Sequence, residues 1–181
     1  MVDLETINKA RGKVLGLTGE RFLHEAVEVV ADTLNIYFVA IYLVDEGREF
    51  VVLRAGSGEF GQRLLKYGHK IRISESGNFN EQAGTAVYLN EIRLAFLETG
   101  RLLAWKTSLG GISGTTIRED IELFVGSPLL PSSRMELFLP LQANGKVIGV
   151  LELSLDVLTE LSQSEILKLQ ELANLLAVKL A

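Results

Sequence analysis

The carboxy-terminal third of the chain carries the pattern that most restricts the folds open to it. Two apolar segments, 135–141 and 146–155, flank a polar stretch that contains Asn144-Gly145. Both residues of this pair tolerate a positive φ, which the two-residue turn of a β-hairpin requires. The sequence Ser-Gln-Ser-Glu at 162–165 is a capping-box pattern, and it opens a predicted helix over 163–180. This part of the chain therefore predicts two antiparallel strands followed by one helix.

The amino-terminal part predicts two helices and a second hairpin. Apolar residues recur at steps of three and four over 4–17 and again over 19–34, which is the spacing of one helical face. Thr18 is the expected N-cap of the second helix. The segments 37–44 and 49–55 are rich in aromatic and β-branched residues, and they predict paired strands.

The middle of the chain is less regular. Short strands are predicted at 70–73 and 93–96, and a short helix near 82–89. Residues 98–124 are predicted to form a long surface excursion, a kind of segment that is usually functional or mobile in a compact domain. The order helix, helix, hairpin, variable middle, hairpin, helix predicts an α+β protein whose antiparallel sheet carries its helices mostly on one face.

Composition excludes several functions. The net charge of −5 argues against a broad basic face for nucleic acid, because phosphate contacts need clustered Lys and Arg. The chain has no cysteine, so disulfides, thiolate catalysis and Cys-ligated metal sites are excluded. The first residues do not resemble a signal peptide, and no run approaches the roughly 20 apolar residues of a membrane helix. We expect a cytoplasmic protein with neither nucleic acid nor membrane as a partner.

Four segments, taken in order, resemble the GAF domain family. They are FLHEAVEVVADTLNIYFVAIYLVDEG, FVVLRAGSGEFG, SSRMELFLPLQANGKVIGVLELS and the terminal LQELANLLAVKLA. The resemblance covers about residues 19–181 and depends on the order and spacing of the segments. Within the family, the chain is similar to bacterial signalling GAF domains with a Gly-His strand start, here Gly68-His69, and a PLLPxSR-x-E motif, here 128–136.

The chain departs from this subgroup at three points. Ser127 stands where the subgroup often has Asn, and residues 101–118 resemble an insertion. The dispersed signature of cyclic-nucleotide GAF domains cannot be placed. The family's covalent bilin attachment and its methionine sulfoxide reductase activity both need a cysteine, so both are excluded here. The cofactor is otherwise left open.

The resemblance implies a GAF-like α+β fold. Its central antiparallel sheet would have about five to six strands, with the N- and C-terminal helices packed on one face and variable loops and short helices on the other. We expect residues 1–18 to form an N-terminal helix, and residues 19–181 to form the GAF-like domain with the excursion at about 98–124.

The implied function is that of a regulatory or sensory domain in a bacterial signalling system. Such a domain would bind an unidentified small molecule, mediate homodimerisation, or do both, and a signalling partner protein is a further possible contact. The alternative is a structural dimerisation module with no ligand. An enzyme is not expected, because no nucleophile, base and acid form a recognisable set. Two isolated histidines, His24 and His69, do not predict a metal site.

The resemblance places a ligand on the side of the sheet that the variable middle segments cover. His69 either contacts a ligand, for example as an axial haem ligand, or closes a hydrogen-bonded turn. Arg134 either orients a ligand or pairs with a carboxylate, and the second role is favoured for both residues. Trp105 covers a pocket, anchors the excursion to the rest of the domain, or contacts a partner. The full set of expected ligand-binding residues is Ala55, Gly56, His69, Ile71, Phe79, Ala83, Val87, Trp105, Arg134 and Glu136.

The terminal helices also predict a contact between two copies of the chain. Each has an apolar stripe, and the last helix has a second apolar strip at Leu167, Leu175 and Val178. The alternative is that the two stripes pack against each other within one chain. We favour the dimer, with an interface formed by Leu4, Ile7, Val14, Leu169, Ala173, Leu176 and Leu180.

Overall fold

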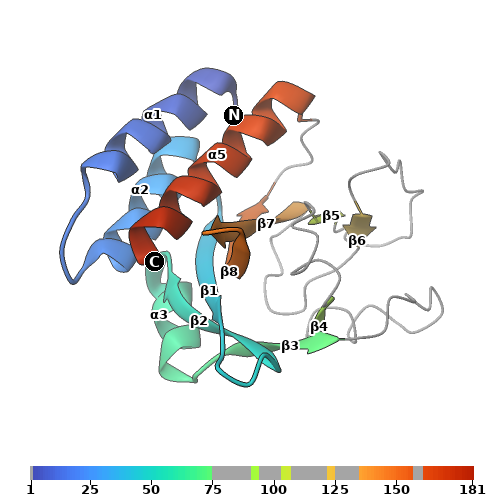
Figure 1. Cartoon of the computed structure of the whole chain (residues 1–181). Helices are drawn as coiled ribbons and strands as arrows, with labels where there is room; N and C mark the ends of the chain where they lie inside the picture. The colour runs from blue at the N-terminus through green and yellow to red at the C-terminus, as the bar shows by residue number, and fades with distance from the viewer. Residues whose placement is uncertain (1, 75–90, 94–102, 107–121, 125–134, 157–160) are drawn as a thin grey trace.

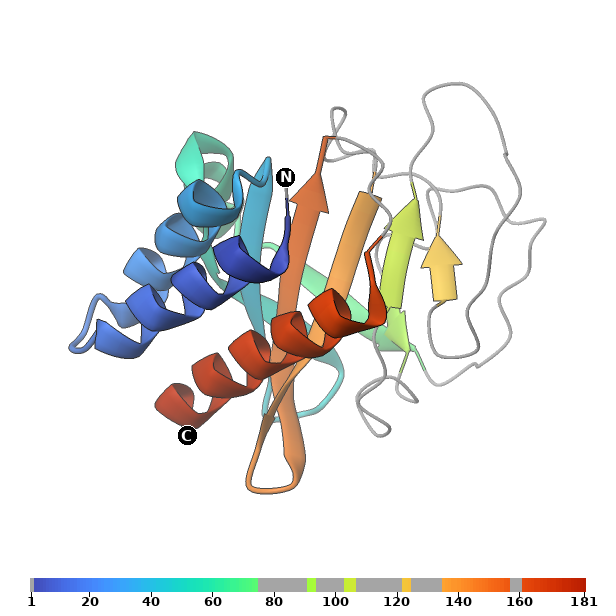
Figure 2. The same cartoon turned by 90° about the horizontal axis from the view of Figure 1, so that it is seen from above.

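A computed structural model of the chain describes residues 2–74, 91–93, 103–106, 122–124, 135–156 and 161–181. These residues form a β-sheet with helices on both faces (Figure 1). Three helices, α1 (Leu4–Gly16), α2 (Phe22–Leu34) and α5 (Gln163–Leu180), lie together on one side of the sheet (Figure 2). The short helix α3 (Gly58–Lys66) packs against the opposite face.

Within the described ranges, eight strands form the sheet, in the order β4-β3-β2-β1-β8-β7-β5-β6. Neighbours from β3 to β5 are antiparallel, and the outermost pairs, β3 with β4 and β5 with β6, are parallel. The prediction of a central antiparallel sheet with terminal helices on one face is confirmed. The strands are β1 (Phe38–Val44), β2 (Phe50–Gly56), β3 (Lys70–Ser74), β4 (Glu91–Arg93), β5 (Leu103–Lys106), β6 (Glu122–Phe124), β7 (Met135–Ala143) and β8 (Lys146–Leu155).

Local signals place most element ends correctly. Asn144 and Gly145 have φ values of 51° and 73°, as the predicted hairpin turn requires. Both bonds of the predicted capping box at the start of α5 are present, between Ser162 and Glu165. The prediction for Thr18 is wrong. Because Gly19 has a φ of 91°, the chain makes one more turn there, and α2 begins only at Phe22.

The helix-side face of the sheet holds the main core. Apolar stripes of α1, α2 and α5 meet the inward-facing residues of β1, β7 and β8, and α1 shares this core with the rest of the chain. The stripes are Ile7, Ala10 and Val14 of α1, Ala26, Val27 and Val30 of α2, and Leu169, Leu172, Ala173 and Leu176 of α5.

The opposite face holds a second cluster, which includes Phe38, Tyr42 and Phe138 and is covered in part by α3. The sequence did not predict α3, since two of the three closely spaced glycines, Gly58 and Gly61, lie in its first turn. Gly56 and Gly61 explain the packing: a Cβ on Gly61 would overlap the backbone of Gly56, so α3 approaches the end of β2 with no side chain between them.

The middle of the chain is described only in part. The predicted excursion contains β5 and β6, whereas the short helix expected near 82–89 lies outside the described residues. No helix in the described ranges has the length and apolar character needed to cross a membrane.

Candidate functional site

A buried carboxyl group lies in the second cluster. Glu152 of β8 is 5% exposed, and strand alternation puts it on the same face as Val150 and Ser154. The Ser154 hydroxyl donates a hydrogen bond of 3.0 Å to Glu152 Oε1, and the Tyr42 side chain also bonds to the carboxyl group. An acid this deep in an apolar face is unusual, because Glu is almost never fully buried without partners.

Burial changes the chemistry of this group. Desolvation raises the pKa of Glu152 to about 7, and the hydrogen bonds from Ser154 and Tyr42 oppose that rise only in part. Near neutral pH the carboxyl group is therefore divided between its protonated and ionised forms. Such a group can change its charge in response to a ligand.

Aromatic side chains surround the acid. Glu152 is paired in register with Ala40 of β1 and with Phe138 of β7. Phe38 and Tyr42, two residues on either side of Ala40, lie on the same face of β1. Phe38 in turn meets Phe60 of α3 edge-on, with ring centroids 5.3 Å apart. Helix α3 thus forms one wall beside the face that carries Glu152.

His69 borders this cluster. Its backbone N–H donates to the Leu64 carbonyl and its carbonyl accepts from the Leu53 N–H, so it closes the turn between α3 and β3. Its ring contacts the Tyr42 ring edge-on at 5.9 Å, and burial lowers the pKa of His69. The structure therefore links His69 through Tyr42 to Glu152.

Two predicted site residues lie beside this cluster in backbone register. Glu136 of β7 is paired with Ser154 of β8 on one side and with Trp105 of β5 on the other. Only the strand positions of Glu136 and Trp105 are described, not their side chains. Ile71 of β3 is paired with Val51 of β2, and for Ile71 too only the strand position is described.

Ala55 does not lie where the predicted ligand-binding set placed it. The register between β1 and β2 shifts, so that Leu53 pairs with Tyr42 but Ala55 pairs with Ile41. Arg54 is the extra residue, and it turns Ala55 from the face of Leu53 to the helix-side core. Ala55 therefore does not face the buried acid.

The remaining predicted ligand residues are placed only in part. Gly56 lies at the contact between β2 and α3, where a Cβ would come within 2.8 Å of Gly61 Cα, and its described role is this packing. Four others lie outside the described residues, namely Phe79, Ala83, Val87 and Arg134.

Most residues of the predicted dimer interface do not lie on the surface of the chain. Most of them are buried within one chain, because the stripes of α1 and α5 pack against each other and the sheet, which is the alternative weighed above. Leu180 is partly buried, and Leu4 remains 41% exposed. The residues that cannot line an outer surface are Ile7, Val14, Leu169, Ala173 and Leu176, each at most 1% exposed.

The helix layer and α3 are joined by two polar contacts. Glu28 Oε1 of α2 accepts a 3.0 Å hydrogen bond from the Gly58 N–H, the first amide of α3. Gln62 Nε2 lies 3.3 Å from His24 Nδ1. Ser57 cannot cap α3 in place of Glu28, because its hydroxyl accepts from the Val39 N–H instead. A carboxylate of α2 thus caps the helix that borders the Glu152 cluster.

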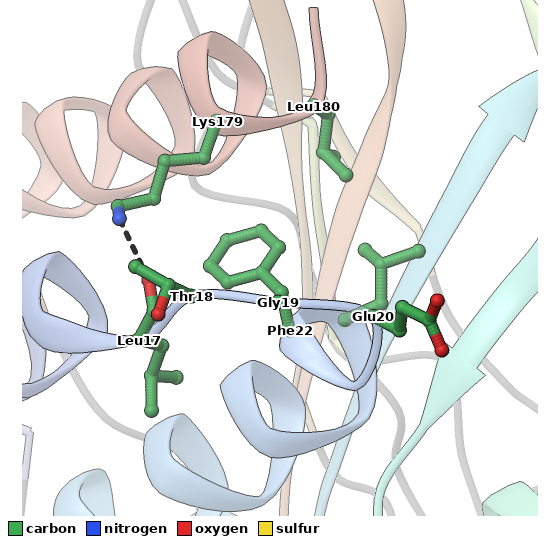
Figure 3. Close-up of a pocket in the computed structure, with 8 residues that line it drawn as sticks. Leu17, Thr18, Gly19, Glu20, Phe22, Lys179 and Leu180 are labelled. Atoms are coloured by element: carbon green, nitrogen blue, oxygen red, sulfur yellow. Dashed lines mark hydrogen bonds between the residues drawn. The ribbon is translucent and has the colours of Figure 1, made fainter.

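A separate hollow lies at the end of α5 (Figure 3). Lys179 Nζ donates a 2.8 Å hydrogen bond to the Leu17 carbonyl and lies 5.5 Å from the centre of the Phe22 ring. This contact attaches α5 to the loop between α1 and α2. The hollow is lined by residues of the helix layer and has none of the cluster around Glu152.

Sequence reasoning missed Glu152, Ser154 and Tyr42. The available signal was an acid and a serine, Glu152 and Ser154, within the mostly apolar strand Lys146–Leu155. In the described part of the chain, no group of three or more His, Cys, Asp or Glu could hold a metal ion.

Comparisons with protein-family models and with curated proteins find no match. Solved structures do match. The GAF domain of a phosphoenolpyruvate-protein phosphotransferase from Acinetobacter has a TM-score of 0.60 at 17% identity, over 97% of this chain and 90% of that chain. The phycoerythrobilin-bound GAF domain of a cyanobacterial phytochrome has a TM-score of 0.59 at 13% identity, over 98% and 95%. The free methionine-R-sulfoxide reductase of Neisseria meningitidis, in complex with its substrate, has a TM-score of 0.57 at 19% identity, over 97% and 86%.

At these identities the likeness concerns the fold, and it confirms the predicted GAF-like α+β architecture. Because one of the three structures is an enzyme, the fold does not decide between a regulatory and a catalytic role.

Proposed function

We propose that this chain, which has the fold of a GAF domain, is a regulatory module that binds a small molecule at the sheet face carrying Glu152. The observation that carries the proposal is the buried carboxyl group of Glu152 among Tyr42, Ser154 and Phe38. An apolar and aromatic surface with a few converging polar groups is the usual chemistry of a ligand site.

The position of α3 supports a regulatory role. Phe60 of α3 contacts the aromatic cluster, whereas the first amide of the same helix is capped by Glu28 of α2. A ligand that moves α3 would therefore act directly on α2 in the helix layer. Since α2 shares its core with α1 and α5, this is a physical route from the ligand face to the terminal helices.

The structural neighbours support small-molecule binding in this fold. One was solved with phycoerythrobilin bound and another with its substrate. The second is a reductase, and the absence of cysteine here removes the thiol chemistry that the GAF resemblance associates with that activity. We therefore propose a sensory rather than a catalytic role.

Native mass spectrometry of protein purified from its own host tests this proposal. A stoichiometric adduct that is released on denaturation is expected, and Glu152→Gln should weaken its retention while Glu46→Gln, an exposed acid in the turn after β1, should not. A clean apo mass, together with no thermal shift across a metabolite panel, would contradict the proposal.

A homodimerisation module is the second candidate, and four exposed apolar side chains favour it. Leu4 and Leu15 of α1 are 41% and 61% exposed, and Leu167 and Val178 of α5 are 59% and 67% exposed. Between them, Arg11 and Glu171 form a half-exposed ion pair at 3.3 Å that links the two helices. A two-fold contact could use both charges symmetrically.

Light scattering after size exclusion tests the dimerisation candidate. Val178→Asp, on the exposed side of α5, should convert a dimer into a monomer without unfolding it. Tyr67→Asp, at an 81% exposed position after α3, is the matched control. A wild-type monomer at high micromolar concentration would rule out the dimer.

A further inference from the structure

We infer that the proposed site takes a cationic ligand, whose ammonium, amidinium or guanidinium nitrogen donates to the Glu152 carboxylate. The inference rests on the proposed function, because it names the chemical class of the ligand at that same site. Three features of the described residues carry it: the free acceptor capacity of the acid, its lack of a described countercharge, and the aromatic surroundings.

The acid has acceptor capacity to spare. An ionised carboxylate offers about four lone-pair sites. In the described part of the chain, Ser154 Oγ and the Tyr42 side chain are the partners of the Glu152 carboxyl group. Ser154 belongs to the same strand as Glu152, and Tyr42 lies on the neighbouring strand β1, so both partners reach the carboxyl group from the sheet itself. Nitrogen donors with more than one hydrogen match that remaining capacity.

The acid has no countercharge among the described residues. The ion pairs there are Arg11 with Glu171 and Lys168 with Glu171, and both belong to the helix layer. Desolvation at 5% exposure makes the ionised carboxylate costly and raises the pKa of Glu152. A ligand that brings its own positive charge removes this cost.

The surroundings suit an organic cation. Phe38 and Tyr42 lie diagonally across from Glu152, because both are two residues from its register partner Ala40. Aromatic faces attract ammonium and guanidinium groups, most strongly where water is excluded. An anion would meet the negative charge of the ionised acid, and a neutral ligand would gain no charge attraction from it. The site thus combines one acid with aromatic walls.

Binding of this kind releases a proton. The protonated Glu152 carboxyl group and the cationic ligand give a carboxylate–cation pair and one proton to solvent. With a pKa of about 7, roughly half a proton is released for each ligand bound at pH 7, and almost none at pH 8.5. A neutral ligand that hydrogen-bonds to the protonated acid would release none at either pH.

The test uses three probes of one size, namely benzylamine, benzyl alcohol and phenylacetate. Thermal unfolding of the full chain is followed with each probe for the wild type, Glu152→Gln and Glu46→Gln. Benzylamine at ten times its Kd should raise Tm by about 3–6 °C in the wild type and in Glu46→Gln. Glu152→Gln should lose that rise. Titration calorimetry in two buffers of different ionisation enthalpy then measures the released proton.

The following results would overturn the inference that the ligand is cationic. A shift by benzyl alcohol or phenylacetate that Glu152→Gln retains would overturn the cationic ligand and leave the small-molecule site standing. No shift with benzylamine would overturn the inference, while native mass spectrometry judges the proposed function separately. If Glu152→Gln fails to fold, the carboxyl pKa of wild-type Glu152 is measured by carbon-13 NMR. It must then fall when benzylamine is added, and an unchanged pKa refutes the inference.

Discussion

Replacing Glu152 by Gln should remove a pH dependence of stability that the buried acid creates. Burial raises the pKa of Glu152 in the folded chain from its ordinary 4.5 to about 7. Between these values the folded state binds more protons than the unfolded state, so stability falls as pH rises. The contribution of Glu152 is fully present below about pH 4.5, and it is lost by about pH 7 to 8.

The size of the effect follows from the same two values. A difference of 2.5 pKa units between 4.5 and about 7 corresponds to about 3 kcal/mol. Gln keeps an oxygen that can accept from Ser154 and Tyr42, but its amide NH₂ has to find a partner, at a cost of about 1–2 kcal/mol. We therefore expect the variant to be about 1–2 kcal/mol more stable than the wild type at pH 8.5, and less stable at pH 5.

Urea unfolding followed by circular dichroism at pH 5, 6, 7 and 8 measures this difference. The gap between wild type and Glu152→Gln should change by about 2.5 kcal/mol between pH 5 and pH 8, because part of the full difference already develops below pH 5. Glu46→Gln, which changes the same charge at an exposed position, should follow the wild type. Parallel curves for the wild type and Glu152→Gln would refute the reasoning, because they would mean that the carboxyl group is not desolvated.

Three further perturbations test the packing of α3 and the cap of α5. Gly61→Ala should cost about 3 kcal/mol in urea unfolding, because its Cβ would overlap the backbone of Gly56, whereas Gly12→Ala in the open face of α1 should stabilise by about 1 kcal/mol. Ser162→Ala should lower stability by about 1 kcal/mol through loss of the α5 capping box, and an unchanged urea midpoint would contradict this. Glu28→Ala should speed hydrogen exchange of the first α3 amides several-fold and leave α5 exchange unchanged, since Glu28 caps α3 from α2.

Signals confined to a few neighbouring residues predicted their structure well. The Asn144-Gly145 turn and the capping box at Ser162 form as expected, because a turn conformation or a helix cap depends on the residues that make it. Helix α3 escaped prediction for the opposite reason. Its start is glycine-rich, and it is held by Phe38 of β1 and Glu28 of α2, neither of which is near it in the sequence.

The candidate site was predicted less well, and the bulge at Arg54 shows why. One extra residue in β2 exchanges the faces of the residues that follow it, and this put Ala55 on the helix side. Glu152 was visible as an acid in an apolar strand. Its burial, its partners and its raised pKa depend on strands β1 and β7, which lie on either side of it in the sheet.

The sequence alone determined most elements, their order and an α+β arrangement, because hydrophobic periodicity, turn residues and caps act over short distances. The GAF-like fold was implied by the resemblance of four segments to that family. The sequence also showed that α1 and α5 each have an apolar stripe, but a stripe has the same pattern whatever covers it. Only the tertiary structure decided that these stripes meet inside one chain and that Glu152, Tyr42 and His69 come together. Such contacts join residues far apart in the sequence, and their geometry is set by strand register and packing.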